Sequence, residues 1–337
     1  MPQYRCRRQR MTPLLTVSNL SRDFVKSLDM VAKVLNRLGQ NYREEVVHAV
    51  DDVSFSVFKG EIVGVVGESG CGKSTLGRMV AGILPPTSGQ VSFDVTQAKN
   101  TDIPDALRTQ MIFQDPFSSL NPRKRVIDII TEAPIHHKLI APSEKRAFAI
   151  EMLQRVGLDP DTLERYPHQF SGGQRQRVGI ARALAVSPEF LVCDESIAAL
   201  DVSIQAQIIN LFVDLKDSYD LTYLFISHDI GVIEHISDRV IVMYLGRIVE
   251  TAPIETFVKQ PNHPYTQALL AGVPRLEVGK RQYEPISGEI PSPLSPPTGC
   301  HFHPRCKFAT ARCKAEKPAL REIAPAHFSA CHLNDEA

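Results

Sequence analysis

The residues with the clearest chemistry form a glycine-rich loop, GESGCGKST, at positions 67–75. The loop matches the pattern G-x-x-x-x-G-K-S/T and lies between an apolar run and a helical pattern, as a phosphate-binding loop requires. Its glycines let backbone N–H groups face phosphate oxygens, and the following helix adds a positive dipole end. Lys73 would reach the β- and γ-phosphates, and the Ser74 hydroxyl would coordinate Mg²⁺. The loop therefore predicts nucleotide binding through Gly67, Glu68, Ser69, Gly70, Cys71, Gly72, Lys73, Ser74 and Thr75.

Two adjacent carboxylates follow an apolar run that reads FLVC, at Asp194 and Glu195. Asp194 would hold Mg²⁺ through its water shell, and Glu195 would orient and deprotonate an attacking water. Many strands end in acidic residues at a surface, so this pair alone is a weak signal. Its position downstream of the phosphate loop favours a second element that contacts the nucleotide.

The elements that must position these residues alternate between strand-like and helical patterns. Buried strands are predicted at residues 190–194 and 222–227, whereas residues 116–186 are mostly helical. Two β-rich runs meet at Lys59-Gly60, which favours a hairpin there. Strands that alternate with helices indicate an α/β fold with a largely parallel sheet.

A Ser-Gly-Gly-Gln turn opens the helical pattern that begins in FSGGQRQRVGIARAL, at residues 170–184. A helix N-terminus of this kind is an anion site. On this motif and its order with the others, the chain resembles the ABC (ATP-binding cassette) ATPases over nearly its whole length. The resemblance implies a P-loop NTPase fold with a RecA-like core, a helical subdomain and an antiparallel β subdomain. It also implies that two cassettes sandwich two ATP molecules, each with Mg²⁺, and that the γ-phosphate faces the other cassette's Ser171, Gly172, Gly173 and Gln174.

Four further positions match family motifs and take their roles from the resemblance. Gln114, in IFQDP, matches the glutamine that senses Mg²⁺ and the γ-phosphate and links to the membrane subunits. Asp201 matches the loop that crosses the dimer interface, and His228 matches the histidine that contacts the γ-phosphate. Phe24 is the expected aromatic partner of adenine, although a core phenylalanine stays an alternative because the insertion at residues 25–46 blurs the alignment. Glu195, His228 and Gln114 are thus the expected catalytic residues.

Several stretches resemble one branch of the family, the ATPases of oligopeptide/dipeptide importers. They include NHPYTQALL at residues 262–270 and a cysteine-containing C-terminal tail, and the chain looks closest to the second ATPase of such pairs. The resemblance implies ATP-driven import of peptides with a second ABC ATPase, two integral membrane permease subunits and, indirectly, an extracytoplasmic solute-binding protein. Nickel, glutathione and sugar-oligomer importers share the branch and remain alternatives. A soluble ABC ATPase acting on DNA or the ribosome is the rival from another class, which often has a second cassette or a long coiled-coil insertion.

Four cysteines crowd the C-terminal tail: Cys300, Cys306, Cys313 and Cys331. In a reducing cytosol such a cluster suggests a metal before a disulfide, and thiolates suit zinc or iron–sulfur clusters. Neither zinc-ribbon nor ferredoxin spacing fits. Relatives in the branch are associated with a 4Fe–4S cluster here, which the resemblance therefore favours, with Zn²⁺ and plain reduced thiols as alternatives. Spare ligands would be His301, His303 and His327.

Bulk properties restrict the setting. The 337 residues include 38 basic and 38 acidic side chains, a balance that argues against a dedicated nucleic-acid binder. No apolar run approaches the roughly 18 residues that span a bilayer, so we expect a peripheral protein at the cytoplasmic face of the inner (plasma) membrane. Residues 1–12 are expected to form a flexible leader, 13–252 the nucleotide-binding domain with a helical subdomain at about 116–178, and 253–337 the C-terminal extension.

Overall fold

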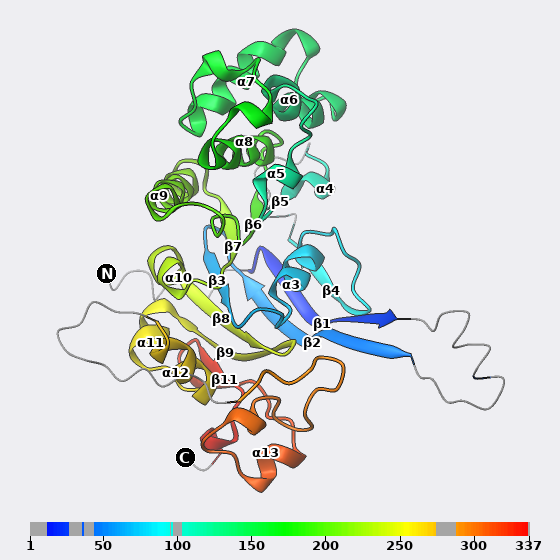
Figure 1. Cartoon of the computed structure of the whole chain (residues 1–337), viewed down its shortest axis with the longest axis vertical. Coiled ribbons are helices and arrows are strands. Elements are labelled where there is room, and N and C mark those ends of the chain that lie inside the picture. Colours follow the sequence, from blue (N-terminus) through cyan, green and yellow to red (C-terminus); the bar gives the residue numbers. More distant parts are fainter. Residues whose placement is uncertain are drawn as a thin grey trace.

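The computed structural model describes residues 12–26, 36, 44–94, 96, 103–273 and 288–335. Within them, a central sheet separates a group of helices at one end of the molecule from the C-terminal residues at the other (Figure 1). Nearly all of the expected leader at residues 1–12 and most of the insertion at residues 25–46 lie outside the described residues.

The central sheet has eight strands: β3 (Ile62–Val66), β5 (Thr109–Ile112), β6 (Phe190–Asp194), β7 (Thr222–Ile226), β8 (Arg239–Tyr244), β9 (Arg247–Pro253), β10 (Arg321–Ala324) and β11 (His327–Ser329). Their order is β10-β11-β9-β8-β3-β7-β6-β5. The five strands from β8 to β5 are parallel, and β9, β11 and β10 extend one edge in antiparallel fashion. The predicted α/β fold with a largely parallel sheet is confirmed, and C-terminal strands belong to the same sheet.

The central strands β3, β6 and β7 are buried along their whole length and are mostly apolar, because both of their faces are covered. In β6, Phe190 and Val192 point into one hydrophobic core, whereas Leu191 and Cys193 point into the other. This alternation follows from the period of two along a strand. One core joins the sheet to the helical end, and the other joins it to a second sheet.

The second sheet is antiparallel and three-stranded, with β1 (Leu15–Lys26) between β2 (Glu45–Val57) and β4 (Ser88–Phe93). The hairpin predicted at Lys59-Gly60 is wrong, because β2 pairs with β1 while β3 lies between β7 and β8 in the other sheet. The turn instead carries the chain from one sheet to the other, with Gly60 at a positive φ of 71°. Alternating patterns identify strands, but they do not identify a strand's partner.

Helices α6, α7 and α8 form the helical end, and α3 follows the phosphate loop beside the sheet (Figure 1). In the part of the chain that the structure describes, no helix combines the length and apolar character needed to cross a membrane. The α-helices are α3 (Lys73–Val80), α4 (Asp105–Arg108), α5 (Pro116–Ser119), α6 (Val126–His136), α7 (Lys145–Arg155), α8 (Gly172–Leu184), α9 (Val202–Tyr219), α10 (Ile230–Ile236), α11 (Ile254–Lys259), α12 (Pro264–Ala271) and α13 (Ala311–Ala315). Short 3₁₀ turns cover Pro142–Glu144, Pro160–Thr162, Pro167–Gln169, His303–Arg305 and His332–Asn334.

Candidate functional site

The phosphate loop connects β3 to α3 and depends on glycines where the backbone is crowded. Gly72 is the N-cap of α3 with φ 102°, and a Cβ there would lie 2.1 Å from the carbonyl oxygen of Ala49. At Gly67, with φ 152°, a Cβ would lie 2.2 Å from the carbonyl oxygen of Met243. Both the left-handed backbone and the lack of space therefore restrict these positions to glycine.

The Lys73 side chain folds back over the start of the phosphate loop. Its ammonium donates hydrogen bonds to the carbonyl oxygens of Gly67, at 2.7 Å, and Glu68, at 3.1 Å. The residue is 4% exposed. The loop carbonyls therefore hold the one ammonium of the loop in place, at the N-terminus of α3, where a triphosphate is favoured.

Two oxygen-bearing side chains meet beside the loop. The Ser74 hydroxyl donates a hydrogen bond of 2.8 Å to Oδ1 of Asp194, at the end of β6. Burial raises the pKa of Asp194, and the bond from Ser74 opposes this effect. A hydroxyl and a carboxylate are hard oxygen ligands, so this pair fits Mg²⁺.

The three expected catalytic side chains come together at Glu195. Gln114 donates from Nε2 to Oε2 of Glu195 at 2.8 Å, and His228 Nδ1 lies 3.4 Å from Oε1. Glu195 has a positive φ of 46°, which is uncommon for a residue with a side chain, and its N–H donates to the carbonyl oxygen of Ile226. The backbone is thus held in a strained conformation that presents the carboxylate between Gln114 and His228.

The Ser-Gly-Gly-Gln turn lies at the start of α8, in the helical end (Figure 1). Ser171 and Gln174 cap it reciprocally: the Ser171 hydroxyl accepts from the Gln174 N–H at 3.4 Å, and Gln174 Oε1 accepts from the Ser171 N–H at 3.0 Å. Both residues are exposed. Among the described residues, the side chains of Ser171 and Gln174 hydrogen-bond to each other's backbone and not to the phosphate loop.

Comparisons with known proteins agree with this geometry. A family model described as ABC transporter matches residues 50–198, and one described as Oligopeptide/dipeptide transporter, C-terminal region, matches residues 249–313. The oligopeptide transport ATP-binding protein AppF of Bacillus subtilis (strain 168) is 52% identical over 295 residues, which cover 85% of this chain and 90% of AppF. The putative oligopeptide transport ATP-binding protein YkfD of the same organism is 46% identical over 333 residues, or 96% of each chain. The chain belongs to the ATP-binding proteins of ABC transporters.

Solved structures of ABC proteins share the fold. The ATP-binding cassette MJ0796, in a dimeric post-hydrolysis structure with ADP and Pi, superposes with a TM-score of 0.58 at 26% identity, covering 71% of this chain and 98% of that one. The cbiO1 protein of Clostridium perfringens gives the same TM-score and identity, with 74% and 92% covered. The predicted ABC fold and ATPase activity are confirmed.

Two other predicted residues of this ABC ATPase lie at the surface. Asp201 is exposed at the N-cap of α9, and the following Val202 is 82% exposed. Phe24 lies on β1 opposite Val47 of β2, is 40% exposed, and has the Arg22 guanidinium 4.8 Å from its ring centroid. An exposed aromatic ring beside a cation is compatible with stacking on a base.

The four tail cysteines of the ATPase line one small pocket, together with His263, Pro264, Phe302, His303, Phe308, His332 and Leu333. Burial raises the pKa of Cys300 to about 11, and it lowers that of His263 to about 4, so both groups are neutral at pH 7. Of the spare ligands, His303 borders the pocket, whereas His301 bonds to Leu245 and His327 to Glu250. In the described residues, no three His, Cys, Asp or Glu side chains are arranged to share a metal ion.

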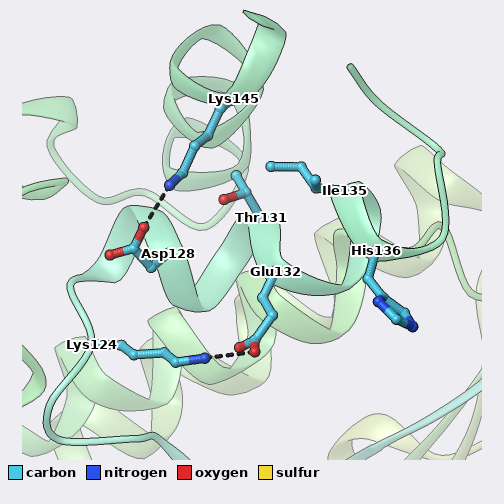
Figure 2. Close-up of a pocket in the computed structure, with 7 residues that line it drawn as sticks. All are labelled: Lys124, Asp128, Thr131, Glu132, Ile135, His136 and Lys145. Atoms are coloured by element: carbon cyan, nitrogen blue, oxygen red, sulfur yellow. Dashed lines mark hydrogen bonds and ion pairs between the residues drawn. The ribbon is translucent and has the colours of Figure 1, made fainter. Parts of the chain in front are cut away.

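A separate, shallow cavity of about 460 Å³ lies at the helical end of the ATPase (Figure 2). Two ion pairs of 2.5 Å line it, Lys145–Asp128 and Lys124–Glu132. These pairs compensate the four charges of the lining, and the cavity lies on α6 and α7, away from α3 (Figure 1). It is therefore distinct from the nucleotide site.

Two residues that sequence reasoning missed contact the phosphate loop from the C-terminal extension. Tyr265, in α12, accepts a hydrogen bond from the Glu68 N–H, and Arg305 forms an ion pair with the Glu68 carboxylate. Tyr265 belongs to the stretch NHPYTQALL, which pointed to a family branch but not to a contact. Arg305 immediately precedes Cys306, and nothing in its sequence neighbourhood identifies a partner 237 positions away.

Proposed function

We propose that this chain is the ATP-hydrolysing subunit that powers import of peptides through an ABC transporter at the cytoplasmic face of the inner membrane. The observation that carries the proposal is the joining of an ATPase site to an extension that matches the oligopeptide/dipeptide transporter C-terminal region. The names of AppF and YkfD, which refer to oligopeptide transport, support the substrate class. Residues 13–252 would form the cassette and residues 253–337 the extension.

In the proposed site, the loop from Gly67 to Thr75 holds the triphosphate and Phe24 stacks on adenine. Ser74 and Asp194 would hold Mg²⁺ together with Gln114, and the ion would neutralise charge on the β- and γ-phosphates. Glu195 accepts a proton from the attacking water. The contacts of Gln114 and His228 with Glu195 support this assignment, because they orient its carboxylate before reaction.

The remaining part of the site would come from a second cassette. Ser171, Gly172, Gly173 and Gln174 of one subunit would cap the γ-phosphate held by the other, and Asp201 would cross the interface. The exposure of Ser171, Gln174 and Val202 supports this division, because an exposed anion-binding turn and an exposed valine are expected at a surface that a partner covers. We propose a second, different ABC ATPase as that partner.

The other partners would be two integral membrane permease subunits, with an extracytoplasmic solute-binding protein acting on them. Closure of the cassette pair on ATP would move the permease subunits, and hydrolysis would release them. The chain would bind no nucleic acid, in keeping with its 38 basic and 38 acidic residues. Nickel or glutathione import would use the same ATPase and differ only in the partner proteins.

The test is Glu195→Gln in the transporter reconstituted in vesicles with its membrane subunits, partner ATPase and binding protein. We expect ATP binding to persist while ATP hydrolysis and peptide uptake fall by roughly 10²–10⁴-fold, the contribution of a positioned general base. Glu255→Gln, at an exposed position in α11, is the matched control. Wild-type turnover in the Glu195 variant would contradict the role, and uptake of nickel or glutathione but not peptides would exclude the peptide substrate.

We also propose that the four-cysteine pocket holds a 4Fe–4S cluster. The shared pocket supports this proposal, since four soft thiolate donors suit iron–sulfur or zinc. Such a centre would act as a structural cross-link within the extension. Because burial favours the protonated thiol at Cys300, loading would release protons and require the sulfurs to move closer together.

Purification of the full-length chain without oxygen tests the cluster. We expect ~4 iron and ~4 sulfide per chain, with loss of both in Cys313→Ser and retention in Cys6→Ser. Zinc in place of iron would support the alternative metal, and neither metal would leave four reduced thiols packing the extension.

A further inference from the structure

One residue of the phosphate loop is held at two points by the C-terminal extension. The two terminal nitrogens of the Arg305 guanidinium each donate to one carboxylate oxygen of Glu68, Nη1 to Oε2 at 2.7 Å and Nη2 to Oε1 at 3.0 Å. The Glu68 N–H donates to the Tyr265 hydroxyl at 2.8 Å. Side chain and backbone of Glu68 are therefore both engaged by residues that lie some 200 positions later in the chain.

The two residues of the extension are themselves firmly placed. The Arg305 side chain is only 4% exposed, and that of Glu68 is 22% exposed. Tyr265 is fully buried, with its ring centroid 4.7 Å from that of Tyr244 and 5.3 Å from that of Phe302. A two-point Arg–carboxylate pair of this kind fixes direction as well as distance, which a lysine could not do.

The hydrogen bonds around Glu68 extend to Lys73, the residue proposed to bind phosphate. Lys73 donates to the carbonyl oxygens of Gly67 and Glu68, which adjoin the peptide held by Tyr265. Within the loop, the Glu68 carbonyl oxygen also accepts a hydrogen bond from the Cys71 N–H at 3.3 Å, so Glu68 joins the contacts of the extension to the loop's own hydrogen bonds. Fixing Glu68 therefore fixes the carbonyls that seat Lys73.

We propose that Arg305 and Tyr265 are positioning residues for ATP: the extension holds Glu68, and through it the phosphate loop, in the conformation that binds the triphosphate. The inference depends on ATP binding alone. It requires neither a peptide substrate nor a metal in the cysteine pocket. A simple docking role would make the same contacts, but it would affect the stability of the fold and leave the loop of the folded chain unchanged.

The experiment measures binding of a fluorescent ATP analogue with Mg²⁺ to the full-length chain, with thermal unfolding of each variant in parallel. We expect Arg305→Met to weaken binding about tenfold, the order expected when hydrogen bonds between charged groups that hold a binding loop are lost. Arg305→Lys should restore part of the affinity through a single-point contact. Tyr265→Phe keeps the buried ring and should weaken binding about threefold.

The matched control is Arg321→Met, which removes an arginine of the extension that pairs with Asp335 and is 60% exposed. It should bind the analogue as tightly as the wild type. The double variant Glu68→Gln/Arg305→Met should be no weaker than Arg305→Met alone, because both changes break one pair. In the assembled transporter, Arg305→Met should raise the KM for ATP by a similar factor and change kcat less than about twofold.

Two results would overturn the inference. One is an Arg305→Met chain that is less stable than wild type yet binds the analogue as tightly as the Arg321 control. The other is a double variant whose losses add, since Arg305 would then act by a route other than Glu68. If Arg305→Met does not fold, Arg305→Lys and Tyr265→Phe take its place beside the Arg321→Met control. Weaker analogue binding by these folded variants would support the inference, and unchanged binding with lower stability would contradict it.

Discussion

The phosphate loop and the Ser-Gly-Gly-Gln turn are both glycine-containing starts of helices suited to anions, but their surroundings differ. The loop is enclosed by its own chain: Lys73 is buried, the Ala49 backbone leaves no room for a Cβ at Gly72, and Glu68 is held by Arg305. At the turn, Ser171 and Gln174 are exposed and cap each other. One element is enclosed within the subunit, whereas the other presents Ser171 and Gln174 at the surface.

This difference is what the proposed division of the site between two subunits requires. A loop that must grip the triphosphate benefits from being rigid before ATP arrives, because ordering it on binding would reduce affinity. A turn that must close on the γ-phosphate has to remain accessible until the partner approaches. Changes in the loop should therefore affect ATP binding by the isolated chain, and changes in the turn should affect only hydrolysis by the pair.

The largest effect should come from Gly72→Ala. The new methyl group would lie 2.1 Å from the carbonyl oxygen of Ala49, and the alanine would have to keep the left-handed backbone of Gly72. Strain and crowding together cost about 2–5 kcal/mol. The affinity of the isolated chain for ATP should therefore fall by roughly a hundredfold or more. Gly82→Ala is the matched control, since Gly82 has φ 72° but nothing within 4 Å of the added carbon. Equal binding by the two variants would show that enclosure of the loop does not matter.

Ser171→Ala should distinguish the role of the turn from that of the loop. The isolated chain should bind ATP normally and lose about 1 kcal/mol of stability with the helix cap. ATP hydrolysis by the assembled pair should fall roughly 10- to 100-fold, the scale of a lost donor to a developing charge. Asp159→Ala removes a comparable cap, which accepts from the Asp161 N–H, in the helical end, and should leave hydrolysis unchanged. Weaker ATP binding by the isolated Ser171 variant would break the proposed division.

How far the sequence could predict this arrangement depends on separation along the chain. The phosphate loop could be predicted because strand, loop and helix are contiguous, so local geometry alone places Lys73 and Ser74 at the start of α3. The pair of Gln114 and Glu195 followed only from a family resemblance. The contact of Arg305 with Glu68 could not be predicted, since an ion pair across 237 residues leaves no periodicity in either segment. The hairpin at Lys59-Gly60 failed for a related reason, because the partners of β2 and β3 are set by the tertiary fold.

Asp194→Asn tests what it costs the folded chain to keep a buried carboxylate beside the enclosed phosphate loop. Burial raises the pKa of Asp194, so keeping this carboxylate ionised at pH 7 reduces the stability of the folded chain. The variant should lose Mg²⁺-dependent ATP binding. Without nucleotide it should unfold at a higher temperature than the wild type, because its free energy of unfolding is about 0.5–2 kcal/mol larger. That gain should disappear as the pH falls through the pKa of Asp194, where the wild-type carboxyl also becomes neutral. Thermal unfolding from pH 4 to 8 provides the measurement, and a gain independent of pH would contradict this origin.

The smallest effect should come from Cys306→Ala. This variant tests whether the cysteine pocket helps to hold the phosphate loop. Cys306 follows Arg305, and its N–H donates to the carbonyl oxygen of His303 in the same short turn. The backbone of that turn does not need the thiol, and Arg305 is anchored at its far end by Glu68. ATP affinity of the isolated chain should therefore change by about twofold or less, against about tenfold for Arg305→Met. Equal losses in the two variants, measured by titration with the same fluorescent analogue, would mean that the cysteine pocket supports the phosphate loop as strongly as the ion pair does.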